Sequence, residues 1–496
     1  MNSMLSQHIK NKTEYIEEAK KLYLSINQDL EKVHFIEYLL NFLIKNVTEY
    51  MSDSFLENEL NKISDSIHSE NNIKYIDGNI LHVMTEAYGT GGHTRLAELF
   101  IKNISSNYKQ DILLTRQGCE LPSIFTNSNI LDKKIILKDD NIFDKSKILF
   151  EIASKYQYVI LHTHKDDVLV NLTFGTKKFK RPVLFVNHAD HAFWSGGSVA
   201  DLVLELSTEG MEFSKSIRGI KNNRVINIPI EEKKVDFSKK EARKKLSIDN
   251  DKKIILSIGT EYKYGSTEEE VKKFIDMAKN IVNNVDKCEF VLIGPSRQNK
   301  FWNEAYEFSN GKINPIGMQS RESLELYIIA SDLYIESFPF SSYSAYLEVL
   351  SLGLSALTLK NEIFSLDVVK RNNMECSSIK EIEEKAINIL NNAIKNEKDF
   401  DIQEHLKEKW SENIISIIDE LKYSKHDVYN IQSKKASIEY LNHTDKVIGN
   451  SLGLNFTYKK LPFFLKIKLG KLMIKYNIIR NFFDFVKLIE RIVVIK

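Results

Sequence analysis

The chain has 496 residues, of which 43% are hydrophobic and 28% are charged, and its formal net charge is +1. This length predicts about two to four domains, and the small net charge excludes a general attraction to nucleic acid. The three cysteines, Cys119, Cys288 and Cys376, lie too far apart for a zinc site or a disulfide framework. Because the start of the chain lacks a signal peptide and no segment reaches the roughly 18 apolar residues of a membrane span, we expect a cytoplasmic protein.

The first 76 residues contain no glycine or proline and repeat apolar residues at helical spacing. We therefore expect residues 1–76 to form a helical N-terminal region, with Thr13 as an N-cap ahead of several glutamates. Such a region can pack against the next domain or bind a partner, and both roles stay open.

Two sets of short apolar runs follow, with helical patterns between them. In residues 77–230 the runs lie at 80–84, 111–114, 134–137, 158–162, 182–187, 201–206 and 224–228; in residues 231–422 they lie at 254–258, 289–293, 313–316, 332–336 and 355–359. Apolar strands that alternate with helices indicate a parallel sheet covered on both faces. The expected fold class is α/β, with two doubly wound Rossmann-like domains, a cleft between them, and ligands at the carboxyl ends of the strands.

Residues 423–496 form a C-terminal helical extension whose last part is basic. Between residues 456 and 496 there are ten Lys or Arg residues and two acidic ones, interleaved with phenylalanines. A basic, aromatic-rich amphipathic tail suits the surface of an anionic membrane. The alternative is a helical hairpin that packs on the protein with its lysines in water.

The loop after the first strand of residues 77–230 contains Gly91 and Gly92 and leads through His93 into a helical run. Glycine lets the backbone approach a ligand closely, and the start of a helix favours an anion. The pattern is also common for purely conformational reasons.

A second motif, at 186–197, holds His188, Asp190 and His191. Histidine is the usual general base near neutral pH, and a nearby carboxylate can orient it. A metal site is the competing interpretation, although no third ligand stands at a suitable spacing. Histidines that serve only a polar loop are a further alternative.

The second domain carries its candidate residues after three of its strands. Lys263 follows the run 254–258 and can bind phosphate as a point charge, unless it is simply a solvated surface lysine. Gly294 ends the run 289–293. After the run 332–336 the strand stops at Pro339, and a helix begins among Ser341, Ser342, Tyr343 and Ser344. Free N–H groups at such a helix start form an anion site.

Several of these motifs occur together over residues 80–359. They are GTGGHTR at 89–95, Lys263 after SIG, VLIGP at 291–295, INPIGMQSRESLELYIIASDLYIESFPF at 313–340, and Glu348 in LEVLSLG. Together they resemble the nucleotide-sugar glycosyltransferases of the GT-B type. The resemblance implies that the second domain holds the donor and the first the acceptor. It also implies that Lys263 and the backbone of 341–344 bind the diphosphate, that Glu348 holds the ribose, and that Gly91 and Gly92 approach the donor.

Phe340 departs from the pattern of many retaining members, which carry two glutamates eight residues apart, the second matched by Glu348. The segment PFSSYSAYLE looks more like the loop of inverting glycosyltransferases that modify protein side chains. Inversion needs a base, for which His191 or Asp190 is the first candidate and His93 the next. Because helix N-termini and Lys263 can stabilise the leaving diphosphate, we expect neither a metal nor a cofactor beyond the donor substrate.

The leading interpretation is therefore a bacterial glycosyltransferase that transfers a hexosyl or N-acetylhexosaminyl group to a glycan or protein. It would act at the cytoplasmic face of the cell envelope, with a nucleotide sugar and an anionic membrane surface as partners and no nucleic acid. One alternative is a catalytically inactive glycosyltransferase-like partner subunit or acceptor-binding chaperone. Another is a nucleotide-sugar epimerase, for which the sequence offers no clear second carboxylate.

Overall fold

The structure of the protein is a computed structural model that describes residues 2–70, 72–89, 92–126, 129–139, 141–231, 237–265, 267–360, 366–372, 374–392, 400–437, 440–441, 456–479 and 482–493. The chain divides into two compact units: Met1–Asn227 with Ser411–Lys496, and Ile228–Trp410. The expected segments 1–76 and 423–496 and residues 77–227 lie in one unit, and the second unit spans Ile228–Trp410.

The first unit contains a seven-stranded parallel sheet in the order β3-β2-β1-β4-β5-β6-β7. Its strands are β1 (Ile76–Met84), β2 (Lys109–Leu114), β3 (Leu131–Ile136), β4 (Tyr156–His162), β5 (Val183–Asn187), β6 (Leu202–Glu205) and β7 (Asn223–Val225). This is the Rossmann strand order, in which the winding reverses between β1 and β4. The sequence prediction of a doubly wound parallel sheet is confirmed here.

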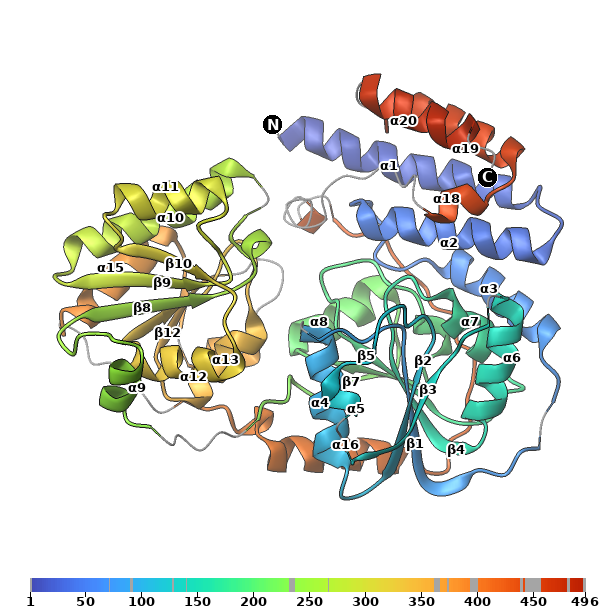
Figure 1. Cartoon of the computed structure of the whole chain (residues 1–496). Helices are drawn as coiled ribbons and strands as arrows, with labels where there is room; N and C mark the ends of the chain where they lie inside the picture. Colours follow the sequence, from blue (N-terminus) through green and yellow to red (C-terminus); the bar gives the residue numbers. More distant parts are fainter. Residues whose placement is uncertain are drawn as a thin grey trace. The chain divides into compact units, whose positions relative to one another are not determined.

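Helices cover both faces of this sheet: α4 (Gly92–Ile104), α5 (Ser123–Thr126), α6 (Ile142–Ala153), α7 (Val168–Phe174) and α8 (Thr208–Phe213) (Figure 1). Alternate residues of a strand face opposite sides of a sheet. Val83 accordingly packs in a cluster with Leu149 of α6. Met84 packs instead in a cluster with Ala97 of α4.

The second unit contains a six-stranded sheet in the order β10-β9-β8-β11-β12-β13. Its strands are β8 (Lys253–Ile258), β9 (Cys288–Ile293), β10 (Ile313–Gly317), β11 (Leu333–Ile335), β12 (Ala356–Leu359) and β13 (Glu375–Cys376), and its helices are α9 (Lys239–Lys245), α10 (Glu268–Asn284), α11 (Lys300–Phe308), α12 (Arg321–Ala330), α13 (Tyr343–Ser351), α14 (Asp367–Arg371) and α15 (Ile379–Leu390). All pairings are parallel, and the winding reverses between β8 and β11. The strand order is again that of a Rossmann sheet.

The two ends of the chain form one helical layer of the first unit. The N-terminal helices are α1 (Asn2–Tyr23), α2 (Asp29–Lys45) and α3 (Ser54–Ile67), and the C-terminal ones are α18 (Phe456–Lys460), α19 (Phe463–Lys475) and α20 (Phe482–Val493), beside α1 and α2 in Figure 1. Leu465, Leu469 and Met473 are fully buried in the core that these helices share. The Thr13 prediction is wrong, because α1 begins at Asn2 and the Thr13 hydroxyl donates to the carbonyl of Ile9 at 3.0 Å.

The C-terminal helical layer also has an exposed side. Phe463 and Phe464 are 54% and 44% exposed, and Lys468 and Lys471 are exposed on the next turns of α19. One face of α19 therefore packs on the protein, as the hairpin alternative expects, while its exposed face is basic and aromatic. No described helix is long and apolar enough to cross a membrane.

The chain returns to the first unit through α16 (Lys407–Glu420). The Ser411 hydroxyl donates to the carbonyl of Asn103 at 3.0 Å, and the Tyr108 hydroxyl donates to Asp419 at 2.9 Å. These bonds attach α16 to the last turn of α4 and to the residues that follow it. All three cysteines are free thiols, as expected.

Candidate active site

The reversal point of the second sheet brings two loops together at the carboxyl ends of neighbouring strands. One loop follows β8 and contains Lys263, and the other follows β11 and spans residues 336–342. The N–H of Phe340 donates to the carbonyl of Lys263 at 3.1 Å, so the loops are bonded to each other. Ligands of open α/β sheets bind at this position, which makes the two loops the candidate donor site.

Glu336 organises the loop after β11. Its carboxylate is buried, and Oε1 accepts hydrogen bonds from the N–H groups of Ser337 (2.7 Å) and Ser342 (2.9 Å). The Ser337 hydroxyl donates to the carbonyl of Phe340 at 2.6 Å. A single carboxylate thus ties both ends of the loop, which includes the cis peptide between Phe338 and Pro339.

The other oxygen of Glu336, Oε2, is buried and has no hydrogen-bond partner within the described part of the chain. Burial raises the pKa of Glu336, while its hydrogen bonds and the charge of Lys263 act in the opposite direction. The loop therefore contains a buried carboxylate with unused hydrogen-bonding capacity beside a lysine.

Lys263 is half-buried and lies against the same loop, with Nζ donating to the carbonyl of Ser341 at 3.4 Å. Burial lowers the pKa of Lys263, and the carboxylate of Glu336 opposes this effect. Within the described part of the chain Nζ contacts a neutral carbonyl and pairs with no carboxylate, so the ammonium group can bind an anion at the loop. This position favours a ligand-binding role over that of a solvated surface lysine.

Gly294 and Gly259 allow the strand-end loops to pack closely. Gly294 has φ +111°, and a Cβ there would lie 1.9 Å from the carbonyl oxygen of Gly259. A Cβ on Gly259 would lie 3.0 Å from the Ser342 hydroxyl. The structure thus gives Gly294 a conformational role, and it places Gly259 against the candidate donor loop.

The helix expected after this loop is present and begins among the predicted residues. α13 begins at Tyr343, and the side chain of the preceding Ser342 makes no capping hydrogen bond. The N–H of Ser342 is bonded to Glu336. The first-turn N–H groups of a helix have no partner inside that helix. The predicted diphosphate contact at 341–344 thus falls at the start of α13, where the N–H of Ser342 is already bonded to Glu336, and this contact stays a prediction.

Glu348 lies in the interior of the same helix and is half-buried. Its Oε1 is 3.9 Å from the guanidinium of Arg321, which also pairs with Glu231 at 2.8 Å. This weak and partly exposed ion pair leaves the Glu348 carboxylate able to accept hydroxyl hydrogen bonds.

The reversal point of the first sheet is surrounded by histidines. His82 lies on β1, His162 ends β4, His164 follows it, His93 lies on α4 and His188 follows β5. The rings of His93 and His188 stack with centroids 4.2 Å apart, and those of His93 and His164 are 5.3 Å apart. Burial lowers the pKa of His93 to about 4, so its ring is neutral at pH 7.

The tautomer of His93 is fixed by its neighbour. Nε2 lies 3.0 Å from the carbonyl oxygen of His162. Because a carbonyl can only accept, Nε2 carries the hydrogen, and Nδ1 of the neutral ring is unprotonated. His93 is thus held in a form that can accept a proton at Nδ1. Gly92, the first residue of α4, is exposed beside it, and Gly91 lies outside the described residues.

The other two base candidates occupy different surroundings. His191 is exposed in the turn that follows Asp190. The Asp190 carboxylate lies against Gly210, at which a Cβ would come within 2.7 Å of Oδ2. Burial raises the pKa of Asp190 to about 6, and the charge of Arg218 opposes the rise. Of the three candidates, His93 stacks on His188, which precedes Asp190 by two residues, and His191 is exposed.

Arg218 is a buried residue that holds the loop of Asp190 and His191. Its guanidinium donates to the carbonyls of Asp190 (2.5 Å) and Ala192 (2.9 Å).

Glu205 is also fully buried, and Asn187 donates to it at 2.8 Å. Burial, reinforced by the charge of Asp190, raises the pKa of Glu205 to about 8.

Two adjacent acidic residues, Asp166 and Asp167, are held by contacts within the first unit. Asp167 caps α7 and accepts hydrogen bonds from the hydroxyls of Thr85 (2.7 Å) and Thr115 (2.6 Å), and Asp166 lies 3.3 Å from Arg116. Among the described residues no group of three or more His, Cys, Asp or Glu side chains could hold a metal ion. Metal independence stays a prediction.

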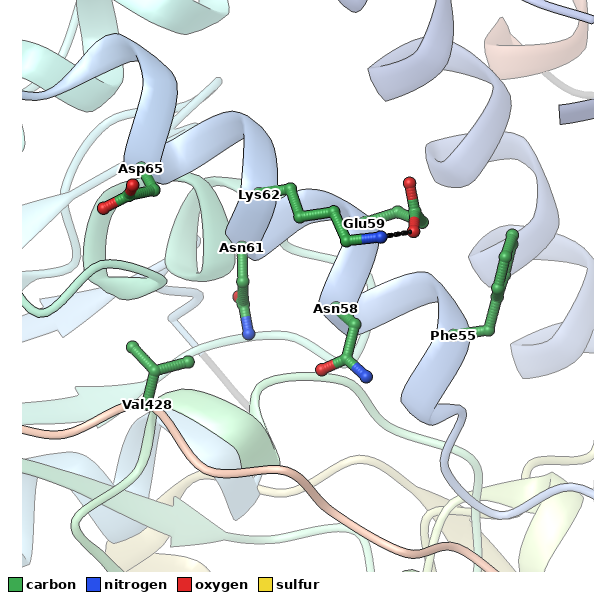
Figure 2. Close-up of a pocket in the computed structure, with 7 residues that line it drawn as sticks. All are labelled: Phe55, Asn58, Glu59, Asn61, Lys62, Asp65 and Val428. Carbon is green, nitrogen blue, oxygen red and sulfur yellow. Dashed lines mark hydrogen bonds and ion pairs between the residues drawn. The ribbon is translucent and has the colours of Figure 1, made fainter. Parts of the chain in front are cut away.

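One cavity lies away from both reversal points. It has a volume of about 500 Å³ and runs along α3, where Asn58 and Lys62 line it opposite Val428 (Figure 2). Lys62 pairs with Glu59 at 2.5 Å, as the dashed line shows. The lining contains none of the candidate site residues, so this cavity has no place in the candidate active site.

Comparisons with known proteins identify the fold. No protein-family model and no curated protein sequence matches the chain. Anabaena Alr3699/HepE, solved with UDP and glucose, has 14% identity and a TM-score of 0.51 over 69% of this chain and 100% of its own. A glycosyltransferase from Rickettsia africae ESF-5 has 13% identity and a TM-score of 0.51, covering 70% and 100%. The lipopolysaccharide outer core galactosyltransferase WaaB has 14% identity and a TM-score of 0.50, covering 69% of this chain and 99% of its own. The chain has the GT-B fold of these structures.

Proposed function

We propose that the protein is a glycosyltransferase that uses a nucleotide-activated sugar. The observation that carries the proposal is the loop at the reversal point of the second sheet, where Lys263 and the start of α13 converge around the buried carboxylate of Glu336. A cation beside helix N–H groups is the arrangement that a leaving diphosphate requires. The similar Anabaena protein was solved with UDP and glucose, which favours a uridine nucleotide as the first donor to test.

In this proposal the donor diphosphate binds to Lys263 and to the backbone of residues 341–344, and Glu348 holds the ribose hydroxyls. As the bond between the anomeric carbon and the diphosphate breaks, negative charge grows on the leaving phosphate. Lys263 supplies positive charge there without a metal ion. The transferred group is a hexose or an N-acetylhexosamine.

The acceptor hydroxyl or amide attacks the anomeric carbon with inversion and gives its proton to a base in the first unit. Among His191, Asp190 and His93, the structure favours His93, because its tautomer is fixed with Nδ1 unprotonated. The acceptor is a glycan or a protein. An inactive partner subunit is the second candidate function, favoured by Phe340 at the position where retaining members carry a glutamate.

The exposed face of α19 adds a membrane role to the proposal. Phe464, Lys468, Lys471 and Lys475 follow one another at spacings of three and four residues, so they share one side of the helix. Aromatic rings and lysines on one helix face suit an anionic membrane surface. We place the enzyme at the cytoplasmic face of a bacterial envelope through this face.

Titration calorimetry with UDP, GDP and CDP tests the donor site. The wild-type protein is expected to bind at least one of the three, and Lys263→Ala is expected to weaken that binding at least tenfold. Lys240→Ala, an exposed lysine on α9, is the matched control. Failure of all three nucleotides to bind would remove the basis for the proposal.

A further inference from the structure

A cavity of about 450 Å³ with polar and apolar walls opens at the carboxyl edge of the first sheet. Part of its wall comes from the sheet: Arg116 after β2 and Asp166 after β4. The rest comes from helices outside the Rossmann-like core, namely His34 and Glu37 of α2 and Lys460 of α18. The volume lies within the range of about 300–1,000 Å³ that is typical of small-molecule sites.

Four of the six charged side chains of the cavity form ion pairs within its wall. Lys460 pairs with Glu37 at 3.1 Å, and Arg116 pairs with Asp166 at 3.3 Å. Lys145 of α6 donates to the carbonyl of Thr115 at 3.2 Å. The three cationic side chains are matched by the three carboxylates of Glu37, Asp166 and Asp167. A wall without net charge favours a neutral ligand over a phosphate or a polyanion.

The wall presents both hydrogen-bond donors and acceptors, and it has an apolar part. Arg116 and Lys145 can only donate, Asp166 can only accept, and burial lowers the pKa of His34, so that its neutral ring does both. Val168 and Leu169 are buried, and Ile142 is half-buried beside them. A sugar matches this lining, because its hydroxyls donate and accept while its C–H faces pack on apolar side chains.

The cavity is connected to the histidine cluster by direct contacts. Asp167 accepts the Thr85 hydroxyl hydrogen bond at 2.7 Å, and the Thr85 hydroxyl oxygen accepts one from the N–H of His164 at 2.8 Å. The ring of His164 lies 5.3 Å from that of His93. The cavity wall is therefore linked to the proposed base, His93, through Asp167, Thr85 and His164.

We propose that this cavity binds one or two neutral sugar residues of a glycan acceptor. Side chains of α2 and α18 complete its wall and contribute to its selectivity for that acceptor. The inference rests on the proposed function and names the acceptor as a neutral oligosaccharide rather than a protein. It gives the helices at the two ends of the chain a role in recognition, through the ion pair of Glu37 with Lys460.

The test is the binding of full-length protein to an array of neutral and anionic di- to tetrasaccharides. Wild-type protein is expected to bind at least one neutral glycan, and Arg116→Ala and Lys145→Ala are each expected to weaken that binding at least tenfold. Lys147→Ala, an exposed lysine on α6, is the matched control. The side chain of Arg116 is 45% exposed, so its loss leaves the fold intact and decides the question if Lys145→Ala does not fold.

Binding of UDP by the same variants separates this inference from the proposed function. Unchanged UDP binding together with lost glycan binding supports a separate saccharide site. No glycan binding by the wild type, binding of anionic glycans only, or full glycan binding by both variants would overturn the inference while leaving the donor site untouched. Glycan binding without any nucleotide binding would overturn the proposed function instead.

Discussion

Glu336 accepts a hydrogen bond from the N–H of Ser342 at 2.9 Å, across a loop of five residues that contains a cis proline. The same oxygen accepts the N–H of Ser337 at 2.7 Å. The loop that we assign to the donor diphosphate is thus shaped by a buried carboxylate at the end of β11. The hydroxyl of Ser342, at the N-cap position, does not cap α13.

Replacement of Glu336 should therefore disturb the loop according to whether an acceptor remains. Glu336→Ala removes the acceptor of two buried N–H groups and is expected to lower the free energy of unfolding by about 1–3 kcal/mol. It should also weaken nucleotide binding. Glu336→Gln keeps a carbonyl acceptor and is expected to retain most of both. Chemical denaturation measures the free energy of unfolding, and calorimetry measures nucleotide binding. Equal losses in Glu336→Ala and Glu336→Gln would refute the role of Glu336 as the hydrogen-bond acceptor of the loop.

His93 and His191 can be separated by their effects on turnover. His93→Gln is expected to reduce kcat by about 10²–10⁴-fold without changing nucleotide affinity, because it removes the proton acceptor. His191→Gln serves as the control and should stay near wild type. Because the pKa of His93 is about 4, kcat/KM should fall only as the pH drops toward 4, where the ring becomes protonated. The reverse pattern of the two variants would move the base to His191.

The buried carboxyl of Glu205 predicts that the free energy of unfolding depends on pH. Burial raises its pKa from 4.5 to about 8, so between these values the folded protein holds a proton that the unfolded chain has released. Stability from this group is therefore present at low pH and is lost as the pH rises toward 8. Glu205→Gln should raise the free energy of unfolding at pH 8 by about 1–3 kcal/mol and have little effect at pH 4.5. Thermal unfolding across this range tests it, with the exposed Glu212→Gln as control; a gain that does not grow with pH would contradict it.

The membrane role of α19 can be tested by charge reversal. Changing Lys468, Lys471 and Lys475 together to Glu should reduce binding to vesicles containing phosphatidylserine at least 100-fold, since each lysine contributes about 1 kcal/mol near such a surface. The same reversal of the exposed lysines 272, 273 and 279 on α10 is the control. Undiminished sedimentation of the α19 variant with the vesicles would show that this face has another purpose.

Much of the fold could be predicted from the sequence because each strand is a short apolar run with a helical pattern on either side. The run 332–336 contains β11 (Leu333–Ile335), and the run 254–258 lies within β8. β13 could not be predicted, since two residues, Glu375 and Cys376, do not make a pattern. Thr13 suggested a helix start, but the preceding residues extend the helix and leave its hydroxyl bonded inside it.

The candidate site was only partly predictable. Lys263, the loop 341–344 and Glu348 follow strand ends and could be found from their positions in the sequence. Glu336 was missed, because the sequence shows it only as a single carboxylate at the end of an apolar run. The pairing of His82 with His162, whose ring nitrogens lie 3.0 Å apart, joins residues 80 positions apart. Such a contact exists only once β1 and β4 lie side by side in the sheet.

The most direct test of the central claim is mass spectrometry of the products formed from a panel of UDP-, GDP- and CDP-sugars without any acceptor. We predict that the wild-type protein slowly hydrolyses at least one donor to the free sugar and the nucleoside diphosphate. We also predict that Lys263→Ala does so about 10²–10³ times more slowly, because it lacks the charge that stabilises the leaving group. A complete lack of hydrolysis, or equal rates for both proteins, would contradict the assignment of this loop as the donor site of a glycosyltransferase.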